Sequence, residues 1–175
     1  MALMVRDFHF GWIFDSAQVA GGLAALRRNG QMFAYYAGNA QFAWVARNQR
    51  LQFAYADSAV RVLRERLQQL PGEERLRMTL AYAYAYAGRY REAVVQADSA
   101  NATRSAWKDG FLGAPLSLSF AEILAMSGEK DHAIALADSL LKVPGFVTAD
   151  YLRVDPYFES VRGDPRFRKL TSPLP

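Results

Sequence analysis

The chain has 175 residues, of which 51% are apolar, 13% aromatic and 22% charged; this composition supports a folded core and excludes a disordered protein. It has no cysteine and only two histidines, which excludes a disulfide framework, a thiolate nucleophile and a cysteine-rich zinc site. No stretch reaches about 18 uninterrupted apolar residues. We therefore expect that this segment does not insert into a membrane and that it lies in the cytoplasm. An extracytoplasmic location remains an alternative if the chain belongs to a longer protein with a transmembrane helix upstream.

The net charge of +4 is concentrated in one part of the chain. Residues 1–70 contain eight basic and four acidic residues, whereas residues 71–175 contain thirteen of each. Arg61 and Arg64 share a helix face, but Asp57 and Glu65 each lie one turn from Arg61 and neutralise part of the patch. No aromatic residue is interleaved there to stack on bases, which argues against a nucleic-acid partner.

A short motif recurs at a nearly constant interval. Asp-Ser-Ala occurs at residues 15–17, 57–59 and 98–100, and Asp-Ser-Leu at 138–140, so the spacings are 42, 41 and 40 residues. After the first three copies a glycine follows fifteen residues from the aspartate, at Gly30, Gly72 and Gly113. Glycine commonly ends a helix. The pattern predicts an array of units of about forty residues.

Each unit has the pattern of two amphipathic helices joined by a tight turn. Between residues 75 and 103, Leu76, Leu80 and Tyr84 fall on one face of a first helix, Gly88 ends it, and alanines at helical spacing line a second helix. Residues 81–87 alternate alanine and tyrosine with the period of a strand, but alanine is a poor strand former and the flanks are helical. The sequence therefore favours a helical hairpin.

In chain order, the pattern predicts one domain of helical hairpins with a C-terminal cap. The predicted units are a lone helix within residues 6–30, hairpins within 31–72, 73–113 and 114–145, and a cap in 146–175. The helices are expected at about 6–28, 31–46, 49–69, 73–87, 90–103, 116–127 and 130–142, with a connector that Gly113 and Pro115 close.

The cap is expected to contain two short helices. Asp155 and Asp164 each precede a proline, which suits the first helical position, and the carboxylates are expected to cap these helices, as is Asp150. A stack of hairpins leaves its last apolar face open. The residues expected to cover it are Tyr151, Leu152, Phe158, Val161, Phe167 and Leu170.

The second hairpin resembles a tetratricopeptide repeat, through Leu80, Ala81, Tyr84, Gly88, Tyr90, Ala93, Ala97 and Ala100. The third matches through Phe120, Ala121, Leu124, Gly128, Ala133, Ala137 and Leu140. Arg77 and Ser117 replace a large aromatic of that pattern. In the first hairpin, Arg47 occupies the position at which the family has the turn glycine. Gln52 occupies the first position of the second helix at which the family has a small residue. The resemblance implies an all-α solenoid of about three hairpins, with six to eight residues inserted between units.

Residues 75–170 also resemble the carboxyl end of repeat regions in bacterial multidomain signalling proteins, where such regions follow a serine/threonine kinase, an adenylate cyclase or a winged-helix regulator. The most specific part is the double Asp-Pro tail, residues 152–158 followed by 161–167. None of those catalytic or DNA-binding motifs is present. The resemblance, together with a first hairpin that lacks its first helix, predicts a fragment of a larger signalling protein.

Tetratricopeptide stacks bind peptides on the concave surface of their first helices. The resemblance implies the corresponding groove positions in this chain. They are Gln41, Trp44 and Val45 in the first hairpin, Arg75, Met78, Tyr82 and Tyr86 in the second, and Leu118, Glu122 and Met126 in the third. Tyrosine and tryptophan offer wide apolar contact with polar tips. We expect a protein or peptide partner there, or a second copy of the chain. The alternatives are a small-ligand pocket formed by Trp44, Tyr82 and Tyr86, and a structural spacer in which the tail buries these aromatics.

Catalytic and metal sites have no support in the sequence. Neither His9 nor His132 has another histidine at metal-ligand spacing. The repeated Asp-Ser pairs lie a full unit apart, so they form no cluster. Hydrolase, zinc-protease and nucleotide-binding motifs are absent. We therefore expect a non-catalytic module without a metal or cofactor.

Overall fold

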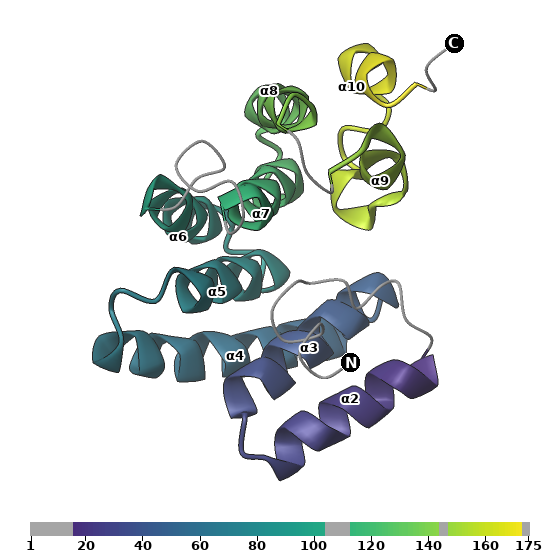
Figure 1. Ribbon diagram of the computed structural model, residues 1–175. Coiled ribbons are helices and arrows are strands. Elements are labelled where there is room, and N and C mark those ends of the chain that lie inside the picture. The colour runs from purple at the N-terminus through teal and green to yellow at the C-terminus, as the bar shows by residue number, and fades with distance from the viewer. Residues whose placement is uncertain (1–15, 104–112, 144–146, 173–175) are drawn as a thin grey trace.

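The structure is a computed structural model that describes residues 16–103, 113–143 and 147–172, and within these ranges it is helical and without strands (Figure 1). Residues 6–15 of the helix expected at about 6–28, residues 104–112 of the connector region, and His9 lie outside the described residues. The described helices are α2 (Ser16–Arg28), α3 (Met32–Val45), α4 (Gln49–Gln69), α5 (Glu74–Tyr86), α6 (Tyr90–Thr103), α7 (Gly113–Met126), α8 (Lys130–Leu141), α9 (Ala149–Val154), the 3₁₀ helix η2 (Pro156–Phe158) and α10 (Pro165–Leu170).

Successive helices pack side by side. α3 packs on α4, α5 on α6 and α7 on α8, so the short turns of the sequence join three helical hairpins. Contacts of α4 with α5 and of α6 with α7 join one hairpin to the next, and α2 packs on α3. In addition, α5 contacts both α3 and α7. The first helices of the three hairpins therefore form one continuous surface, which we call the first-helix face.

Three tight turns place glycine in the left-handed region. Gly30, Gly88 and Gly128 have φ values of 68°, 73° and 82°, which glycine adopts without steric cost. In the α3–α4 turn, Arg47 takes the same conformation with φ 57°. This is the position where the repeat pattern leads one to expect glycine. All four turns thus contain a residue in the left-handed conformation. In three of them this residue is glycine, and in the turn of the first hairpin it is Arg47.

We expect Gly128→Ala to lower the free energy of unfolding by about 1 kcal/mol, because a Cβ atom makes the left-handed conformation unfavourable. A Cβ added at Gly128 meets no atom within 4 Å, so the loss reports the backbone alone. Gly21 lies inside α2 with equally open space; Gly21→Ala is the matched control and should stabilise by about 0.5–1 kcal/mol. Urea denaturation followed by circular dichroism measures both, and an equal effect of the two substitutions would contradict the assignment.

Two sequence-based expectations about helix starts are wrong. α7 begins at Gly113, not near Leu116, so Gly113 opens a helix and does not close a connector. Pro115 lies in the first turn, where its missing N–H costs no helical hydrogen bond. Asp150 does not cap α9. The capping side chain is that of Thr148, whose Oγ1 accepts a hydrogen bond from the Tyr151 N–H at 3.1 Å.

The other two carboxylate caps are confirmed. Asp155 Oδ1 accepts from the Tyr157 N–H at 2.9 Å at the start of η2, and Asp164 Oδ1 accepts from the Arg166 N–H at 2.9 Å at the start of α10. Each is followed by a proline at the first helical position. The two Asp-Pro pairs therefore start helices as the sequence indicates.

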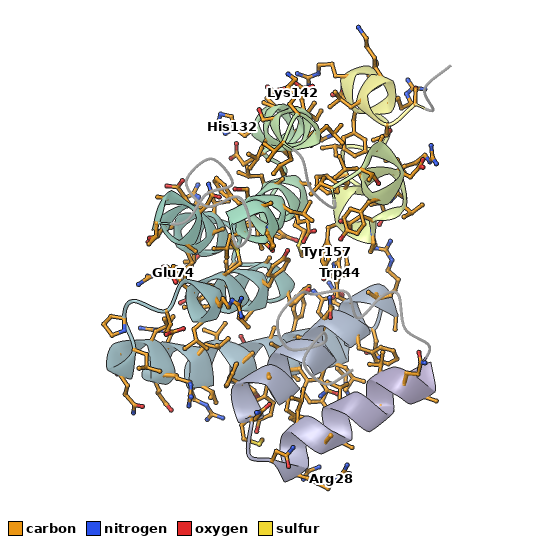
Figure 2. All side chains as sticks on the ribbon, in the orientation of Figure 1. Arg28, Trp44, Glu74, His132, Lys142 and Tyr157 are labelled. Carbon is orange, nitrogen blue, oxygen red and sulfur yellow. The ribbon has the colours of Figure 1, made fainter. Side chains whose placement is uncertain are left out.

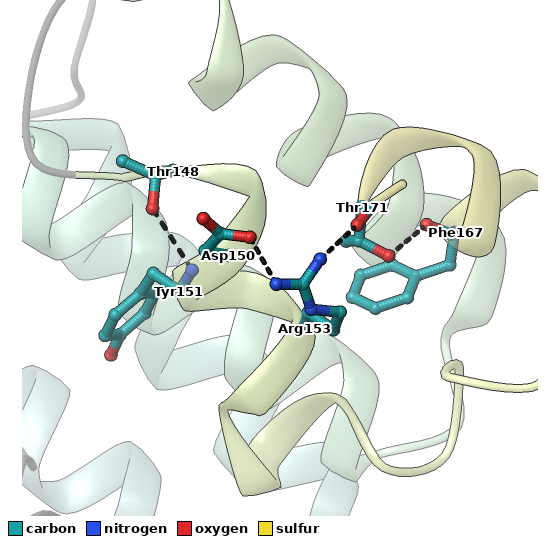
Figure 3. Close-up of polar contacts among 6 residues, drawn as sticks. All are labelled: Thr148, Asp150, Tyr151, Arg153, Phe167 and Thr171. Atoms are coloured by element: carbon teal, nitrogen blue, oxygen red, sulfur yellow. Dashed lines mark hydrogen bonds and ion pairs between the residues drawn. The ribbon is translucent and has the colours of Figure 1, made fainter. Parts of the chain in front are cut away.

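α9 and α10 are tied together by Arg153, which lies between them (Figure 3). Its guanidinium pairs with Asp150 one turn earlier and donates to the Thr171 carbonyl oxygen at 3.2 Å. Thr171 Oγ1 in turn donates to the Phe167 carbonyl oxygen at 3.0 Å. The segment 147–172, which we call the C-terminal segment, thus has internal polar contacts of its own.

The C-terminal segment also completes a hydrophobic core. Its buried side chains pack with those of α7 and α8, as expected for a cover of the last hairpin, and the fully buried ones are Leu152, Phe158, Val161 and Phe167. A second core runs through α3 to α7, and a small third one joins α2 to α3. None of the helices described reaches the length and apolar character needed to cross a membrane.

Candidate functional site: a buried aromatic and carboxyl cluster

The expected groove residues lie mostly under cover. Tyr82 and Tyr86 are 0% exposed, and Gln41, Met78, Leu118 and Glu122 are also buried. Trp44 and Met126 are half-buried, whereas Val45 and Arg75 are exposed. The expectation that these side chains line an open groove is therefore wrong for the six buried ones. For Gln41, Tyr82, Tyr86 and Glu122 the physical reason is that the C-terminal segment lies on the first-helix face.

Tyr157 of η2 is the side chain that covers the face. Its ring stacks on that of Trp44 with centroids 4.9 Å apart and an interplanar angle of 8°, and Figure 2 shows the two residues side by side. Its hydroxyl accepts a hydrogen bond from Gln41 Nε2 at 2.6 Å and lies 2.6 Å from the Tyr86 hydroxyl. Tyr157 therefore contacts both α3 and α5 with its ring and with its polar tip.

The flanks of η2 are held to two different hairpins. Glu159 forms an ion pair with Arg47 in the α3–α4 turn, and Ser160 Oγ donates to the Ala125 carbonyl oxygen of α7 at 2.6 Å. The Arg47–Glu159 pair is exposed and contributes little to stability. Together with Tyr157, these contacts place η2 across the first helices of the first and third hairpins.

A pair of carboxyl groups lies beneath Tyr157. The Tyr82 hydroxyl donates a hydrogen bond to Glu122 Oε2, and the Glu122 side chain faces Asp155, the N-cap of η2. Burial and then the nearby Asp155 carboxyl raise the pKa of Glu122 well above its ordinary value. The shift favours the neutral form of Glu122, because burying a charged carboxylate is unfavourable.

Asp155 is the second member of the pair and is 0% exposed. Burial raises the pKa of Asp155 to about 6, although the Tyr157 N–H and the Glu122 carboxyl favour its charged form. Among the described residues, no hydrogen bond of good geometry reaches its Oδ2 atom. The side chains near Asp155 are Glu122, Tyr151 and Arg162, and the positive charge of Arg162 also favours the charged form of Asp155. The two carboxyls thus form a proton-sharing pair between α7 and the C-terminal segment.

This arrangement does not expose its polar groups to a substrate. The Tyr82, Tyr86 and Tyr157 phenols are neutral, because burial raises the pKa of each above its ordinary value. No group of three metal-ligating side chains occurs in the described parts of the chain. The cluster can hold the C-terminal segment in one position, because the buried polar groups of Gln41, Tyr86 and Tyr157 are hydrogen-bonded to one another.

Sequence reasoning identified one half of this cluster and missed the other. Gln41, Trp44, Tyr82, Tyr86 and Glu122 were expected on one surface, and the structure brings them together. Asp155 was expected only to cap a helix, and Tyr157 was given no role of its own. The available signal was a tyrosine directly after an Asp-Pro pair, since a buried tyrosine needs a partner for its hydroxyl.

Comparisons with known proteins leave the family open: no family model, curated protein or solved structure matches the chain. What the structure defines is an all-helical protein with a buried aromatic and carboxyl cluster under its C-terminal segment.

Proposed function

We propose that the chain is a tetratricopeptide-like stack that acts as a non-catalytic protein-interaction module, as part of a larger bacterial signalling protein. In this proposal the first-helix face binds a peptide segment of a partner, and the C-terminal segment occupies the same face when no partner is bound. The observation that supports the proposal is the position of Tyr157 on the first-helix face. Its ring is stacked on Trp44 and its hydroxyl is bonded to Gln41 and adjacent to Tyr86.

A surface that recognises a peptide needs an apolar site with a few placed polar groups. The first-helix face has both, because Trp44 supplies a flat ring and Gln41 and Tyr86 supply hydrogen-bonding tips. A partner segment carrying an aromatic residue with a polar tip would find the same contacts. The C-terminal segment is then an internal ligand, and a partner competes with it.

The alternatives from the sequence differ in what they require. A small-ligand sensor requires a pocket between Trp44, Tyr82 and Tyr86, and Tyr157 fills that place. A structural spacer requires the aromatics to be permanently covered by the tail. The burial of Tyr82 and Tyr86 fits the spacer as well as a displaceable segment, so the experiment must separate these two.

Exchange of the C-terminal segment separates them. We expect a fluorescently labelled peptide of residues 147–172 to bind the full-length Tyr157→Ala variant at least about tenfold more tightly than the wild-type chain, because the peptide supplies the missing tyrosine. Fluorescence anisotropy measures the two affinities.

The matched control is the same peptide with Tyr157→Ala. It should bind each chain much more weakly than the unaltered peptide does, because it lacks the tyrosine that the first-helix face binds. If the unaltered peptide binds the variant no more tightly than the wild-type chain, the C-terminal segment is a permanent part of the core. The chain would then act as a structural spacer.

A further inference from the structure

A second surface lies on the other side of α5. Arg77, Leu80 and Tyr84 line it, and these positions point away from the face that carries Met78, Tyr82 and Tyr86, because residues two apart in a helix differ by about 200° in direction. With neighbouring side chains of α4 and α6 they form a cleft of about 450 Å³. Its polar lining residues are Arg64, Gln68, Arg77, Tyr84, Arg89 and Gln96.

The polar groups of this cleft are chiefly hydrogen-bond donors. Three guanidinium groups line it, and no acidic side chain does so in the part of the chain that the structure describes. Arg77 donates to Gln96 Oε1 at 3.1 Å, which leaves the donor end of that amide for another partner. Guanidinium groups have five donors and no acceptor. An occupant that satisfies this lining has to supply acceptors.

Two of the three arginines are held in place by the fold. Arg77 also donates to the Pro71 carbonyl oxygen at 2.9 Å, so contacts with the α4–α5 turn and with α6 fix it. Arg89 lies over the Tyr84 ring, 4.6 Å from its centroid, and pairs with the exposed Glu92 at 2.8 Å. Groups positioned before binding lose less freedom when a ligand arrives.

The third arginine, Arg64, forms no ion pair with any residue that the structure describes, and it is exposed on α4. Glu65 is its neighbour in sequence but points about 100° away around the helix. Arg64 lies on α4, Arg77 on α5 and Arg89 in the α5–α6 turn, so three different parts of the chain supply the arginines of the cleft.

We propose that this cleft binds an acidic peptide segment of a protein partner, whose carboxylates pair with Arg64, Arg77 and Arg89. Charge complementarity carries the choice, since carboxylates are the acceptors that guanidinium groups bind in bidentate geometry. Leu67 and Leu80 also line the cleft, and this apolar part of the lining favours a peptide, which has apolar groups to place there, over a free anion. This surface is independent of the first-helix face, so the two proposals succeed or fail separately.

Titration of a labelled hexaglutamate peptide into the full chain, followed by anisotropy, tests the proposal. We expect Arg64→Gln with Arg89→Gln to weaken binding at least about tenfold and high salt to weaken it in the wild type. The matched control is Arg28→Gln with Arg168→Gln, which removes the same charge at exposed positions on α2 and α10; it should weaken binding less than about twofold.

Three results would overturn the proposal. They are no binding of hexaglutamate, equal weakening by the two double variants, and displacement of the peptide by an oligothymidine of equal charge at lower concentration, which would assign the cleft to a nucleic acid. Thermal unfolding shows whether each variant is folded. If the Arg64→Gln, Arg89→Gln double variant is not, Arg64→Gln alone decides, with an expected weakening of about threefold.

Discussion

Tyr157→Ala is expected to lower the free energy of unfolding by about 3–5 kcal/mol, the usual range for removing a large buried aromatic side chain. Tyr157 is 2% exposed and its ring lies against those of Trp44 and Tyr82. Alanine removes these contacts and leaves a cavity between η2 and the first-helix face. It also removes the hydroxyl that lies 2.6 Å from the buried Tyr86 hydroxyl, and loss of a buried partner adds a desolvation cost.

Tyr157→Phe separates the two contributions. Phenylalanine keeps the ring stacked on Trp44 but removes the hydroxyl that Gln41 and Tyr86 contact. We expect a loss of about 1–2 kcal/mol, since a buried hydrogen-bonding group then lacks its partner. The rest of the free energy lost in Tyr157→Ala, which is the larger part, comes from removing the ring.

Urea denaturation monitored by circular dichroism measures these losses. Val154→Ala is the matched control, because Val154 lies in the same segment and is 57% exposed; it should change the free energy of unfolding by less than about 0.5 kcal/mol. A Tyr157→Ala effect as small as that of the control would mean that the C-terminal segment is not held on the first-helix face by its tyrosine.

The helices were predictable from the sequence because each is specified locally. Gly88 and Gly128 end helices by their backbone freedom, and Asp155 and Asp164 start them by capping. The start of α7 was missed because proline is tolerated in a first turn as well as in a connector, and local pattern does not distinguish the two.

The cluster was only half predictable because its two halves are far apart in the sequence. The contact of Gln41 with Tyr157 joins residues 116 positions apart, and no periodicity specifies such a pair. Gln52 illustrates the same limit. It departs from the small residue of the repeat pattern, yet its Nε2 donates to the Tyr86 carbonyl oxygen at 2.6 Å at the end of α5. A departure from the pattern thus satisfies a helix end in the next hairpin.

The second large effect is a dependence of stability on pH. Asp155 has a pKa of about 6 in the folded chain against an ordinary value of 3.8, and the pKa of Glu122 is raised well above 4.5. The folded chain therefore binds protons more tightly than the unfolded chain, and stability falls as pH rises between the two values of each group. For Asp155 the loss is complete slightly above pH 6 and amounts to about 3 kcal/mol.

Asp164 affects the stability of the folded chain in a lower pH range than the buried pair does. Hydrogen bonds from Arg166 lower the pKa of Asp164 to about 2, so its contribution is present above its ordinary value of 3.8 and is lost only as pH falls below it. Among the described carboxyl groups with shifted pKa values, those of the buried pair are the ones that lose stabilisation as the pH rises from about 5 to about 8. We expect a higher free energy of unfolding at the lower pH.

Glu122→Gln tests whether the buried pair is the cause. Glutamine keeps the shape, still accepts from the Tyr82 hydroxyl and carries an N–H that can donate to Asp155, but it cannot ionise. At about pH 8 the variant should be more stable than the wild type by on the order of 1–3 kcal/mol, and its pH dependence should be smaller. Asp164→Asn is the control and should leave the difference between the two pH values unchanged. A wild-type chain as stable at the higher pH as at the lower one would show that Glu122 and Asp155 do not share a proton, and the C-terminal segment would then be held by its aromatic contacts alone.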